Sequence, residues 1–260
     1  MIPKIIHFCW FGGNPLSELA EKCIESWKKY CPDYEIIRWD ESNFDVNQNT
    51  YCREAYEAKK WAFVSDYARL KVLYEYGGIY MDTDVEVIRC LDSFLTYTAF
   101  LGFESPTHLG TSIIASKKEA TWIWDLLSYY DSKIFINQNG EMGLTPNTKV
   151  VTDMMLSKYQ LKLNNSYQYL NNEVIVFPIE YFCPKDYYSG NLSITDNTHT
   201  IHHYNGSWHS ECWQWRLKFM HKYSKYFGQN GARILSLFLY CIKTSDFKEL
   251  KSKIKSIYKK

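Results

Sequence analysis

Two aspartates separated by one residue, Asp82 and Asp84, are the residues of this sequence whose type and spacing most directly suggest chemistry. They follow a short apolar run, and on an extended strand alternate side chains share a face, so both carboxylates should point the same way. Neighbouring carboxylates repel each other, and together they favour a hard divalent cation. The pair therefore predicts a Mg²⁺ or Mn²⁺ site that could hold a diphosphate. A solvated Asp-Thr-Asp turn is the alternative for a D-x-D pattern taken alone.

Asp66 and Arg69 form a second charged pair, on a helix expected over residues 61–76. Because they are three residues apart, they lie on one face of that helix. Such a pair is usually a surface salt bridge of little energetic consequence. Its position one helix before the acidic pair makes it a candidate for binding sugar hydroxyls instead. The helix is expected to end at Gly77-Gly78, since glycine tolerates the left-handed dihedrals of a helix terminus.

The first residues predict one half of a nucleotide-binding α/β fold. A buried strand over 5–11, a helix that ends near Tyr30 and a second strand over 34–39 follow one another. Folds of this kind bind ligands beyond the carboxyl ends of their strands, which places residues 10–13 at the site. Trp10 could stack there on a nucleobase, and a core tryptophan is the other interpretation.

The alternation of strands and helices continues to about residue 208. Further strands are expected over 85–88, 94–103, 110–115, 173–177 and 200–204, and further helices over 51–59, 118–130 and 150–158. Asn147 or Thr148 could cap the last of these helices, or their loop could contact substrate. Of the adjacent His202 and His203 on the last strand, only one can face the site, and a lone strand histidine is more often structural than a ligand.

The charge distribution separates the end of the chain from its body. Of a net charge of +1, residues 213–260 carry +10, from 12 Lys and Arg against two Asp and Glu, which leaves −9 for residues 1–212. The basic segment is helical in pattern over 209–227, 232–242 and 247–258. The last of these helices could lie on an anionic membrane surface or dock on its own domain. We therefore expect a domain over residues 1–208 and a basic helical extension over 209–260.

The cysteines and the apolar runs indicate in which cellular compartment the protein is expected. The eight cysteines show no C-x-x-C motif and no disulfide-framework spacing, so we interpret them as reduced. The first ten residues lack the features of a signal peptide, and no apolar run approaches the roughly 20 residues that span a bilayer. These observations predict a cytoplasmic protein without a transmembrane segment.

Four spaced motifs together resemble the family 32 glycosyltransferases. This family includes bacterial capsule and lipopolysaccharide sugar transferases and shares its donor-site core with the large clostridial glucosylating toxins. The motifs are Ile2-Pro3-Lys4-Ile5-Ile6-His7 with Trp10 and Gly12-Gly13, Ser65-Asp66-x-x-Arg69, Gly77-Gly78-x-Tyr80-x-Asp82-x-Asp84, and His202 with Ser207-Trp208. The resemblance covers about residues 1–208. It implies an α/β fold of the GT-A type, in which helices flank a Rossmann-like mixed sheet, and transfer from a nucleotide sugar with retention of anomeric configuration.

The resemblance also implies roles along a donor site. Trp10 would stack on the nucleobase, and Asp66 and Arg69 would hold hydroxyls of the donor sugar and act in catalysis. The other donor-site positions would be Gly12, Ser65, Tyr80, Asp82, Ser207 and Trp208.

Metal binding follows from the same resemblance. Asp84 would bind the cation directly, whereas Asp82 would touch it through water and would also hold ribose or sugar. His202 would be a third ligand near the diphosphate, with His203 as its rival. No carboxylate stands out as a nucleophile, so we expect same-face attack by the acceptor hydroxyl, with double displacement as the fallback.

The leading hypothesis is a metal-dependent, retaining hexosyltransferase that uses a nucleotide sugar, preferably UDP-linked, with Mn²⁺ or Mg²⁺. Its acceptor would be a lipid-linked glycan of bacterial surface polysaccharide at the inner face of the cell membrane, to which the basic extension could bind. The alternatives are a toxin-like effector that glycosylates a host protein and a non-enzymatic carbohydrate-binding module. Nucleic acid is not expected as a partner, because paired carboxylates would repel its phosphates without a metal.

Overall fold

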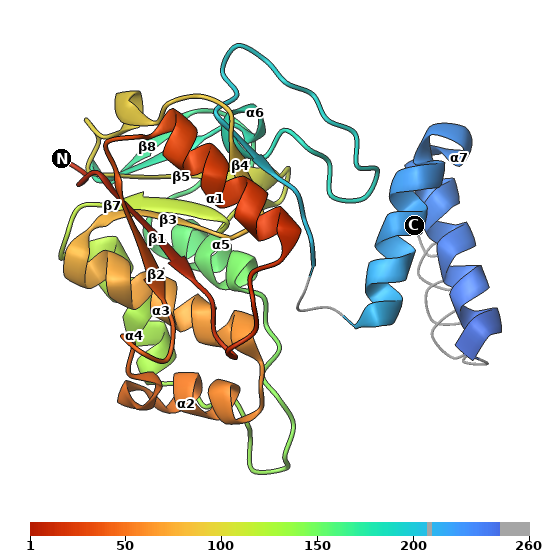
Figure 1. The fold of residues 1–260 in the computed structure, drawn as a ribbon, viewed down its shortest axis with the longest axis horizontal. Helices are drawn as coiled ribbons and strands as arrows, with labels where there is room; N and C mark the ends of the chain where they lie inside the picture. The colour runs from red at the N-terminus through yellow and green to blue at the C-terminus, as the bar shows by residue number, and fades with distance from the viewer. Residues whose placement is uncertain (207–209, 245–260) are drawn as a thin grey trace. The chain divides into compact units, whose positions relative to one another are not determined.

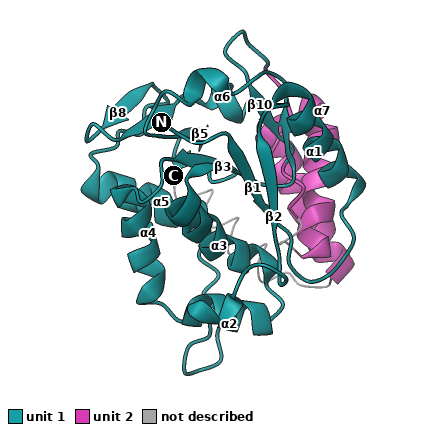
Figure 2. Cartoon of the chain, turned by 60° about the vertical axis from the view of Figure 1, so that its left-hand side comes forward, with its two compact units in different colours: residues 1–184, 194–203 teal, residues 185–193, 204–260 magenta. Residues whose placement is uncertain are grey.

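Residues 1–206 and 210–244 are described by the computed structural model of this chain. Their contacts divide the chain into two units, which Figure 2 colours separately. Unit 1 comprises Met1–Pro184 and Ile194–His203, and unit 2 comprises Lys185–Ser193 and Tyr204–Lys260. The division falls near the boundary expected after residue 208, but it groups the loop 185–193 with the end of the chain.

Unit 1 is built on a mixed sheet of eight strands (Figure 1). The strands are β1 (Ile5–Cys9), β2 (Glu35–Trp39), β3 (Gly78–Met81), β5 (Ala99–Ser105), β6 (His108–Leu109), β7 (Ile113–Ser116), β8 (Gln168–Leu170) and β9 (Val174–Phe177). They lie in the order β2-β1-β3-β7-β5-β9-β8, with β6 paired to β5. β1 runs parallel to β2 and β3, whereas β7 is antiparallel to both β3 and β5. Two further strands, β4 (Val85–Val87) and β10 (Thr200–His202), form a separate antiparallel pair.

Helices and short segments cover both faces of this sheet. The helices of unit 1 are α1 (Glu18–Tyr30), α2 (Thr50–Glu57), α3 (Trp61–Tyr76), α4 (Thr121–Asp131), α5 (Asn147–Lys158) and α6 (Ile179–Phe182), with a short 3₁₀ helix η1 (Val46–Gln48) before α2. One hydrophobic core lies between the sheet and helices α2 to α5, and a second lies on the opposite face with α1, α6 and β4.

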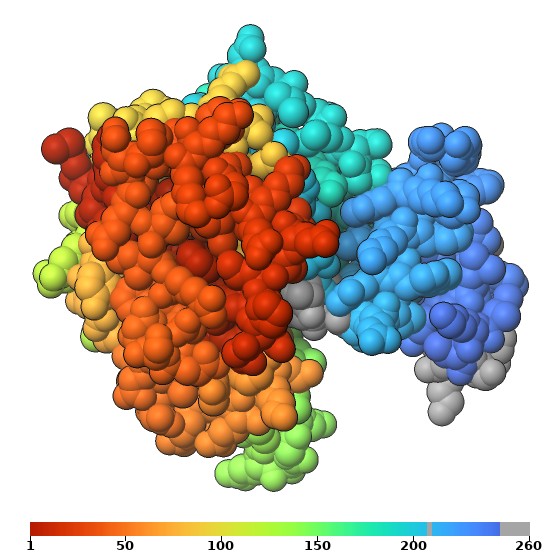
Figure 3. All heavy atoms as spheres, in the orientation of Figure 1, coloured from red at the N-terminus to blue at the C-terminus, as the bar shows by residue number. Residues whose placement is uncertain are grey.

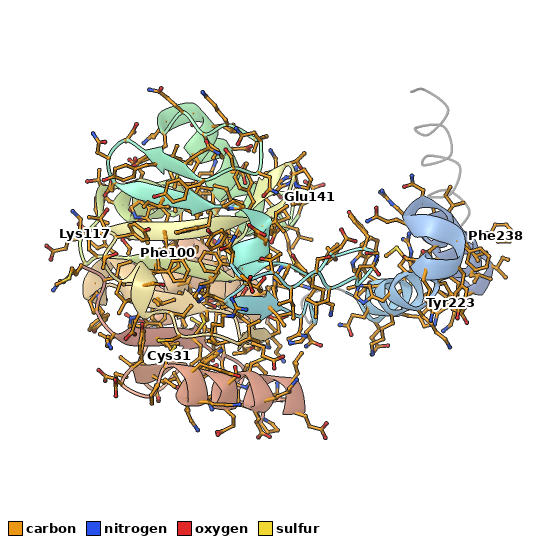
Figure 4. All side chains as sticks on the ribbon, turned by 90° about the horizontal axis from the view of Figure 1, so that it is seen from above. Cys31, Phe100, Lys117, Glu141, Tyr223 and Phe238 are labelled. Carbon is orange, nitrogen blue, oxygen red and sulfur yellow. The ribbon has the colours of Figure 1, made fainter. Side chains whose placement is uncertain are left out.

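The two cores fill the interior of unit 1. Phe100 on β5 is fully buried in the second core and lies inside the unit in Figure 4, whereas Lys117 and Glu141 are exposed. In Figure 3, the N-terminal residues, red to orange, form much of the face of unit 1 that is turned to the viewer. Both faces of the mixed sheet are therefore covered, and the apolar side chains of its strands are removed from water.

Local sequence sets the ends of the helices that border the site. α1 begins after Ser17, whose hydroxyl accepts a hydrogen bond from the N–H of Ala20 at 3.2 Å. α3 ends at Gly77, which has a φ of 68°, and a Cβ there would lie 2.7 Å from the backbone nitrogen of Lys118. Glycine is required at this position by both its dihedral and its surroundings. It turns the chain directly from α3 into β3.

The strand predicted over 94–103 is wrong at its start. Asp92–Phe94 forms a short 3₁₀ helix, η2, and β5 begins only at Ala99. Phe94 turns inward, where its ring centroid lies 5.3 Å from that of Phe100 and 5.2 Å from that of Phe182. An apolar run that packs into the second core was therefore taken for part of a strand. The helix predicted over 61–76 is confirmed, and all eight cysteines are free thiols, as predicted.

Unit 2 contains α7 (Glu211–Thr244), whose two helical arms meet at Gly228, with φ 68° and ψ 165°. This kink confirms the two helices predicted over 209–227 and 232–242, and glycine is the residue that adopts its positive φ without strain. The labelled Tyr223 and Phe238 in Figure 4 lie one on each arm. The helix predicted over 247–258 lies outside the described residues. None of the helices described here is long and apolar enough to cross a bilayer.

Candidate functional site

The two aspartates lie in a turn between β3 and β4, not on an extended strand. β3 ends at Met81 and β4 begins at Val85, whose N–H donates a hydrogen bond to the carbonyl of Asp82 at 3.0 Å. The prediction that strand alternation aligns Asp82 and Asp84 is therefore wrong. The turn achieves the same result, because it brings both side chains back to one place at the end of β3.

A third residue joins the two aspartates there. Ligand atoms of Asp82, Asp84 and His202 all lie within 4.8 Å of one another. His202 ends β10, and the pairing of β10 with β4 sets it opposite Val85, the residue after Asp84. Two carboxylate oxygens and one imidazole nitrogen are a donor set that suits Mn²⁺, and Mg²⁺ through the carboxylates. The residues present therefore fit the divalent cation that the sequence predicts.

The neighbouring histidine faces elsewhere. His203 Nε2 lies 2.8 Å from Glu86 Oε2, and Lys22 Nζ lies 3.3 Å from the same oxygen. His202 Nε2 instead lies 3.4 Å from Asp84 Oδ1. Burial opposes the charge on His202, but the Asp84 carboxylate beside it outweighs burial and raises the pKa of this imidazole well above its usual value. Strand alternation thus separates the two candidates, and His202 is the one near the acids.

Arg69 connects the acidic turn to helix α3. Its Nη1 donates to the carbonyl of Thr111 at 2.8 Å and lies 3.2 Å from Asp82 Oδ1, while its Nη2 donates to Asp66 Oδ1 at 3.0 Å. Its Nε donates to the carbonyl of Ser65 at 3.1 Å. Arg69 and Asp66 are only 5% and 8% exposed. The pair is therefore not a surface salt bridge but a buried ion pair that also holds the DXD turn.

The surroundings of Asp66 disfavour the charged form of its carboxylate. Burial raises its pKa to about 6, Arg69 acts in the opposite direction, and Asp82 adds to the rise. Burial also opposes the charge on Arg69, but the acidic groups around it, Asp82 foremost, keep the pKa of the guanidinium raised. Perturbed groups of this kind cluster where a protein binds or transforms a ligand.

Tyr80 supports the acidic turn from β3. Its hydroxyl donates a hydrogen bond to Asp82 Oδ1 at 3.0 Å, and the guanidinium of Arg69 lies 4.6 Å from its ring centroid. Tyr80 is almost fully buried. In the structure Tyr80 thus orients Asp82 and Arg69. Its expected role in lining a donor site stays a prediction.

The residues expected to hold a nucleoside lie at the end of β1. Trp10 is partly exposed, and its Nε1 donates to the carbonyl of Asn14 at 2.7 Å. The N–H of Gly12 donates to Glu41 Oε1 at 2.7 Å, and a Cβ at Gly12 would lie 2.7 Å from the indole of Trp61. An open depression beside these glycines is lined by Gly12, Gly13, Asn14, Glu41, Tyr56, Lys59 and Trp61. The sequence analysis missed Tyr56 and Trp61, the two aromatic residues of this depression, because neither belongs to a motif.

Two of the predicted donor-site residues, Ser207 and Trp208, lie outside the described residues. Ser65 is on α3, and its hydroxyl donates to the carbonyl of Trp61 at 3.0 Å. Its backbone carbonyl, rather than its hydroxyl, therefore binds Arg69.

Two polar residues near the site were missed or misread from the sequence. Asn147, proposed as a helix cap, is instead the first residue of α5, is 4% exposed, and accepts a hydrogen bond from the Tyr130 hydroxyl at 3.3 Å. Glu104 lies in an irregularity of the β5–β6 pairing, and burial raises its pKa to about 7, with His202 acting against the rise and Asp82 adding to it. Neither has a spacing relation to the DXD motif, so only the fold brings them near it.

Comparison with known proteins finds a family match for the segment around this site. Residues 17–101 match the family described as glycosyltransferase sugar-binding region containing DXD motif. The matched segment begins at the N-cap of α1 and includes α3 and both aspartates of the turn. This segment therefore resembles a glycosyltransferase sugar-binding region.

Curated proteins are similar to part of this chain. Inositol phosphoceramide mannosyltransferase 3 of Schizosaccharomyces pombe is 34% identical over 124 residues, which cover 45% of this chain and 34% of that protein. Mannosyl phosphorylinositol ceramide synthase SUR1 of Saccharomyces cerevisiae is 30% identical over 155 residues, which cover 56% of this chain and 40% of that protein. The chain thus spans less than half the length of these two relatives.

A solved structure supports the fold. The PaToxG glycosyltransferase superposes with a TM-score of 0.50 and 23% sequence identity, over 60% of this chain and 69% of that one. Together with the mixed sheet and its flanking helices, this confirms the predicted α/β fold of the GT-A type.

Proposed function

We propose that this protein transfers a sugar from a nucleotide-sugar donor to an acceptor hydroxyl, with a divalent cation held by Asp82, Asp84 and His202. One observation carries the proposal: inside the sugar-binding segment, the acidic turn lies directly beside the buried Asp66–Arg69 pair. The first group of residues suits a cation with a diphosphate, and the second suits sugar hydroxyls.

Each residue has a separate task in this proposal. The cation, when bound, neutralises the charge that develops on the leaving diphosphate. Tyr80 and Arg69 both hold Asp82 Oδ1, so that this carboxylate keeps one orientation. Asp66 accepts hydrogen bonds from the donor sugar, and Arg69 keeps Asp66 in place while it adds positive charge to the site.

Transfer retains the anomeric configuration in this proposal. The acceptor hydroxyl attacks from the face that the diphosphate leaves, the bond between the anomeric carbon and the phosphate oxygen breaks, and the leaving phosphate takes the hydroxyl proton. Double displacement would need a carboxylate nucleophile, and Glu104 is the additional acid that interacts electrostatically with Asp82. Mass measurement of the intact protein after incubation with donor and Mn²⁺ but no acceptor separates the two. An adduct that Glu104→Gln abolishes would overturn same-face attack.

The acceptor and donor are proposed from the relatives. Both relatives are named as enzymes that mannosylate inositol-containing ceramides. They favour a mannose donor and a lipid-linked acceptor for this chain, rather than the UDP-linked donor and the bacterial capsule or lipopolysaccharide glycan first expected. The sugar-binding elements of unit 1 are common to both choices.

A panel of nucleotide sugars tests this function directly. The full chain is incubated with Mn²⁺ and UDP-glucose, UDP-galactose, UDP-N-acetylglucosamine or GDP-mannose, and nucleotide release is measured with and without a membrane lipid extract. We expect release from one donor, stimulated by the extract, and labelled sugar in the lipid phase. Label in protein instead would favour the toxin-like alternative, and release from none of the donors would contradict the proposal.

We also propose that the protein works at the cytoplasmic face of a membrane, bound through unit 2. The second arm of α7 exposes Ile234, Phe238 and Ile242, which are 46%, 46% and 53% exposed and four residues apart, on one helical face. The segment that contains this arm carries the excess of lysine and arginine. Apolar side chains within a basic segment support binding to anionic lipid. Flotation with anionic vesicles should recover the parent chain but not Ile234→Ser/Phe238→Ser/Ile242→Ser, and equal recovery would contradict the proposal.

A further inference from the structure

Glu86 lies on β4, two residues after Asp84, and holds the histidine that faces away from the acids. His203 Nε2 lies 2.8 Å from Glu86 Oε2, and Lys22 Nζ donates to the same oxygen at 3.3 Å. Because a carboxylate only accepts hydrogen bonds, the His203 ring donates here from Nε2. A ring nitrogen that carries a proton has no lone pair for a cation. Glu86 therefore keeps this nitrogen of His203 from binding metal.

The backbone pairing places His203, rather than His202, directly across from Asp84. The register of β4 with β10 sets His202 opposite Val85. One position further, the His203 N–H donates to the Asp84 carbonyl at 2.9 Å, so these two residues lie across from each other. Residues opposite each other in an antiparallel pair have Cβ atoms about 4.5 to 5.5 Å apart, close enough for their side chains to interact. His203 is therefore well placed to compete with His202 for the Asp84 carboxylate.

The strand itself is held without Glu86. Helix α1 binds the backbone of β4 at two points. Trp27 Nε1 donates to the Val85 carbonyl at 2.7 Å, and Trp27 is fully buried. The Val87 N–H donates to the Ser26 hydroxyl at 2.9 Å. The Glu86 side chain is instead 21% exposed, and ion pairs in contact with water add little to stability. A purely structural role thus explains the Trp27 contact better than it explains Glu86.

We propose that Glu86 is a positioning residue of the cation site, because it holds His203 away from Asp84. Asp84 then acts with His202 and Asp82 on the cation. In the absence of Glu86, the His203 ring would pair with the Asp84 carboxylate, and a cation would have to displace it before binding. Partners of this kind outside the ligand set commonly tune metal affinity. The inference rests on the cation site of the proposed function, and adds the residue that selects between two adjacent histidines.

Binding of Mn²⁺ to the full chain, without nucleotide, tests this role through the electron paramagnetic resonance signal of free Mn²⁺. In Glu86→Ala we expect the Kd for Mn²⁺ to rise roughly tenfold. The double variant Glu86→Ala/His203→Ala should return to within about threefold of the parent, since the competing imidazole is gone. His203→Ala alone should stay within about twofold of the parent, as should Glu25→Ala, which removes an exposed acid of α1.

The double variant distinguishes positioning from simple stabilisation. If Glu86 only held the strand, removing His203 as well would leave the Kd as weak as in Glu86→Ala or weaken it further, and this result would overturn the inference. An unchanged Kd in Glu86→Ala would overturn it too. Glu86→Gln, whose amide oxygen still accepts a hydrogen bond from His203, should give a Kd between those of the parent and Glu86→Ala.

The same measurement separates this inference from the proposed function. Absence of Mn²⁺ binding by the parent protein would overturn the cation site, and the positioning role of Glu86 with it. If the expected order of Kd values is found in a protein that releases nucleotide from none of the donors, the role of Glu86 is supported and sugar transfer alone is contradicted.

Discussion

Two buried polar clusters lie at α3, and they differ in how completely their hydrogen bonds are made. The first surrounds His7 on β1, which is fully buried. Its Nδ1 accepts from Trp39 Nε1 at 3.0 Å, and its Nε2 donates to the carbonyl of Gly77, at the end of α3, at 2.8 Å. Both ring nitrogens are therefore used, and burial lowers the pKa of the imidazole to about 4, so that it stays neutral.

The second cluster surrounds Arg69, two turns earlier on the same helix. Here Asp66 has a raised pKa, and Asp82 shares one guanidinium nitrogen with the carbonyl of Thr111. Groups of this kind destabilise the protein without ligand. The difference teaches how to separate structural from functional polar residues: the His7 cluster is complete in itself, whereas we propose that a cation and a sugar complete the Arg69 cluster.

The largest expected effect comes from removing one acid of the cation site. Asp84→Ala should lower sugar transfer about 1000-fold, because the charge on the leaving diphosphate would no longer be neutralised in place. The stabilisation of the protein by Mn²⁺ in a thermal shift assay should disappear in the same variant. Asp33→Ala, at an exposed aspartate of unit 1, is the matched control and should change neither quantity. Transfer by Asp84→Ala within tenfold of the parent would contradict the assignment.

The opposite result is expected at the structural cluster. His7→Leu leaves the Trp39 N–H and the Gly77 carbonyl without partners, and should lower the free energy of unfolding by about 3 kcal/mol. Transfer by the folded fraction should stay within about twofold of the parent. Urea unfolding and kinetics at a temperature where the variant is folded measure the two quantities. A large loss of activity with little loss of stability would reverse the roles given to the two clusters.

The sequence predicted the residues of the site better than the way in which they are held. Asp82 and Asp84 converge through a turn that depends on β4 pairing with β10, and that pairing joins residues more than 100 positions apart. No local pattern records such a contact. The choice between His202 and His203 depends on the same pairing.

The start of the fold was predictable for a different reason. The strand, helix, strand order and the extent of α3 follow from apolar periodicity and from Gly77, which are local properties of the chain. Asn147 and Glu104 carry no such signal, since each becomes a neighbour of the acids only after the sheet has formed. The Tyr130 contact that orients Asn147 is likewise a contact between two helices.

The titration of His7 extends the comparison to stability against pH. Its pKa is about 4 in the folded protein and about 6.5 when unfolded, so the unfolded state binds more protons between these values. The contribution of His7 to the free energy of unfolding is therefore full above pH 6.5. It falls by up to about 3 kcal/mol as the pH drops toward 4. Unfolding measured from pH 7.5 to 4.5 should show this decline, and His7→Leu should lack that part of it. Parallel curves for both proteins would show that His7 is not the group responsible.

The smallest effect on the free energy of unfolding is expected at Asp66, and its sign is opposite to that at His7. Its folded pKa of about 6 lies above the usual value of 3.8, so the charged form destabilises the folded protein once the pH rises through this range. Asp66→Asn removes that charge and leaves Arg69 paired with Asp82. Because one ion pair is lost at the same time, we expect the free energy of unfolding to rise by about 1 to 2 kcal/mol at pH 7.5, measured in EDTA without donor. This rise should shrink toward zero by pH 4. Transfer should nevertheless fall at least tenfold, since a sugar hydroxyl exchanges a charged acceptor for the weaker neutral amide oxygen. A variant both more stable and less active would show that Asp66 is maintained for its ligand; one that is less stable at pH 7.5 would place it with His7 among the structural residues.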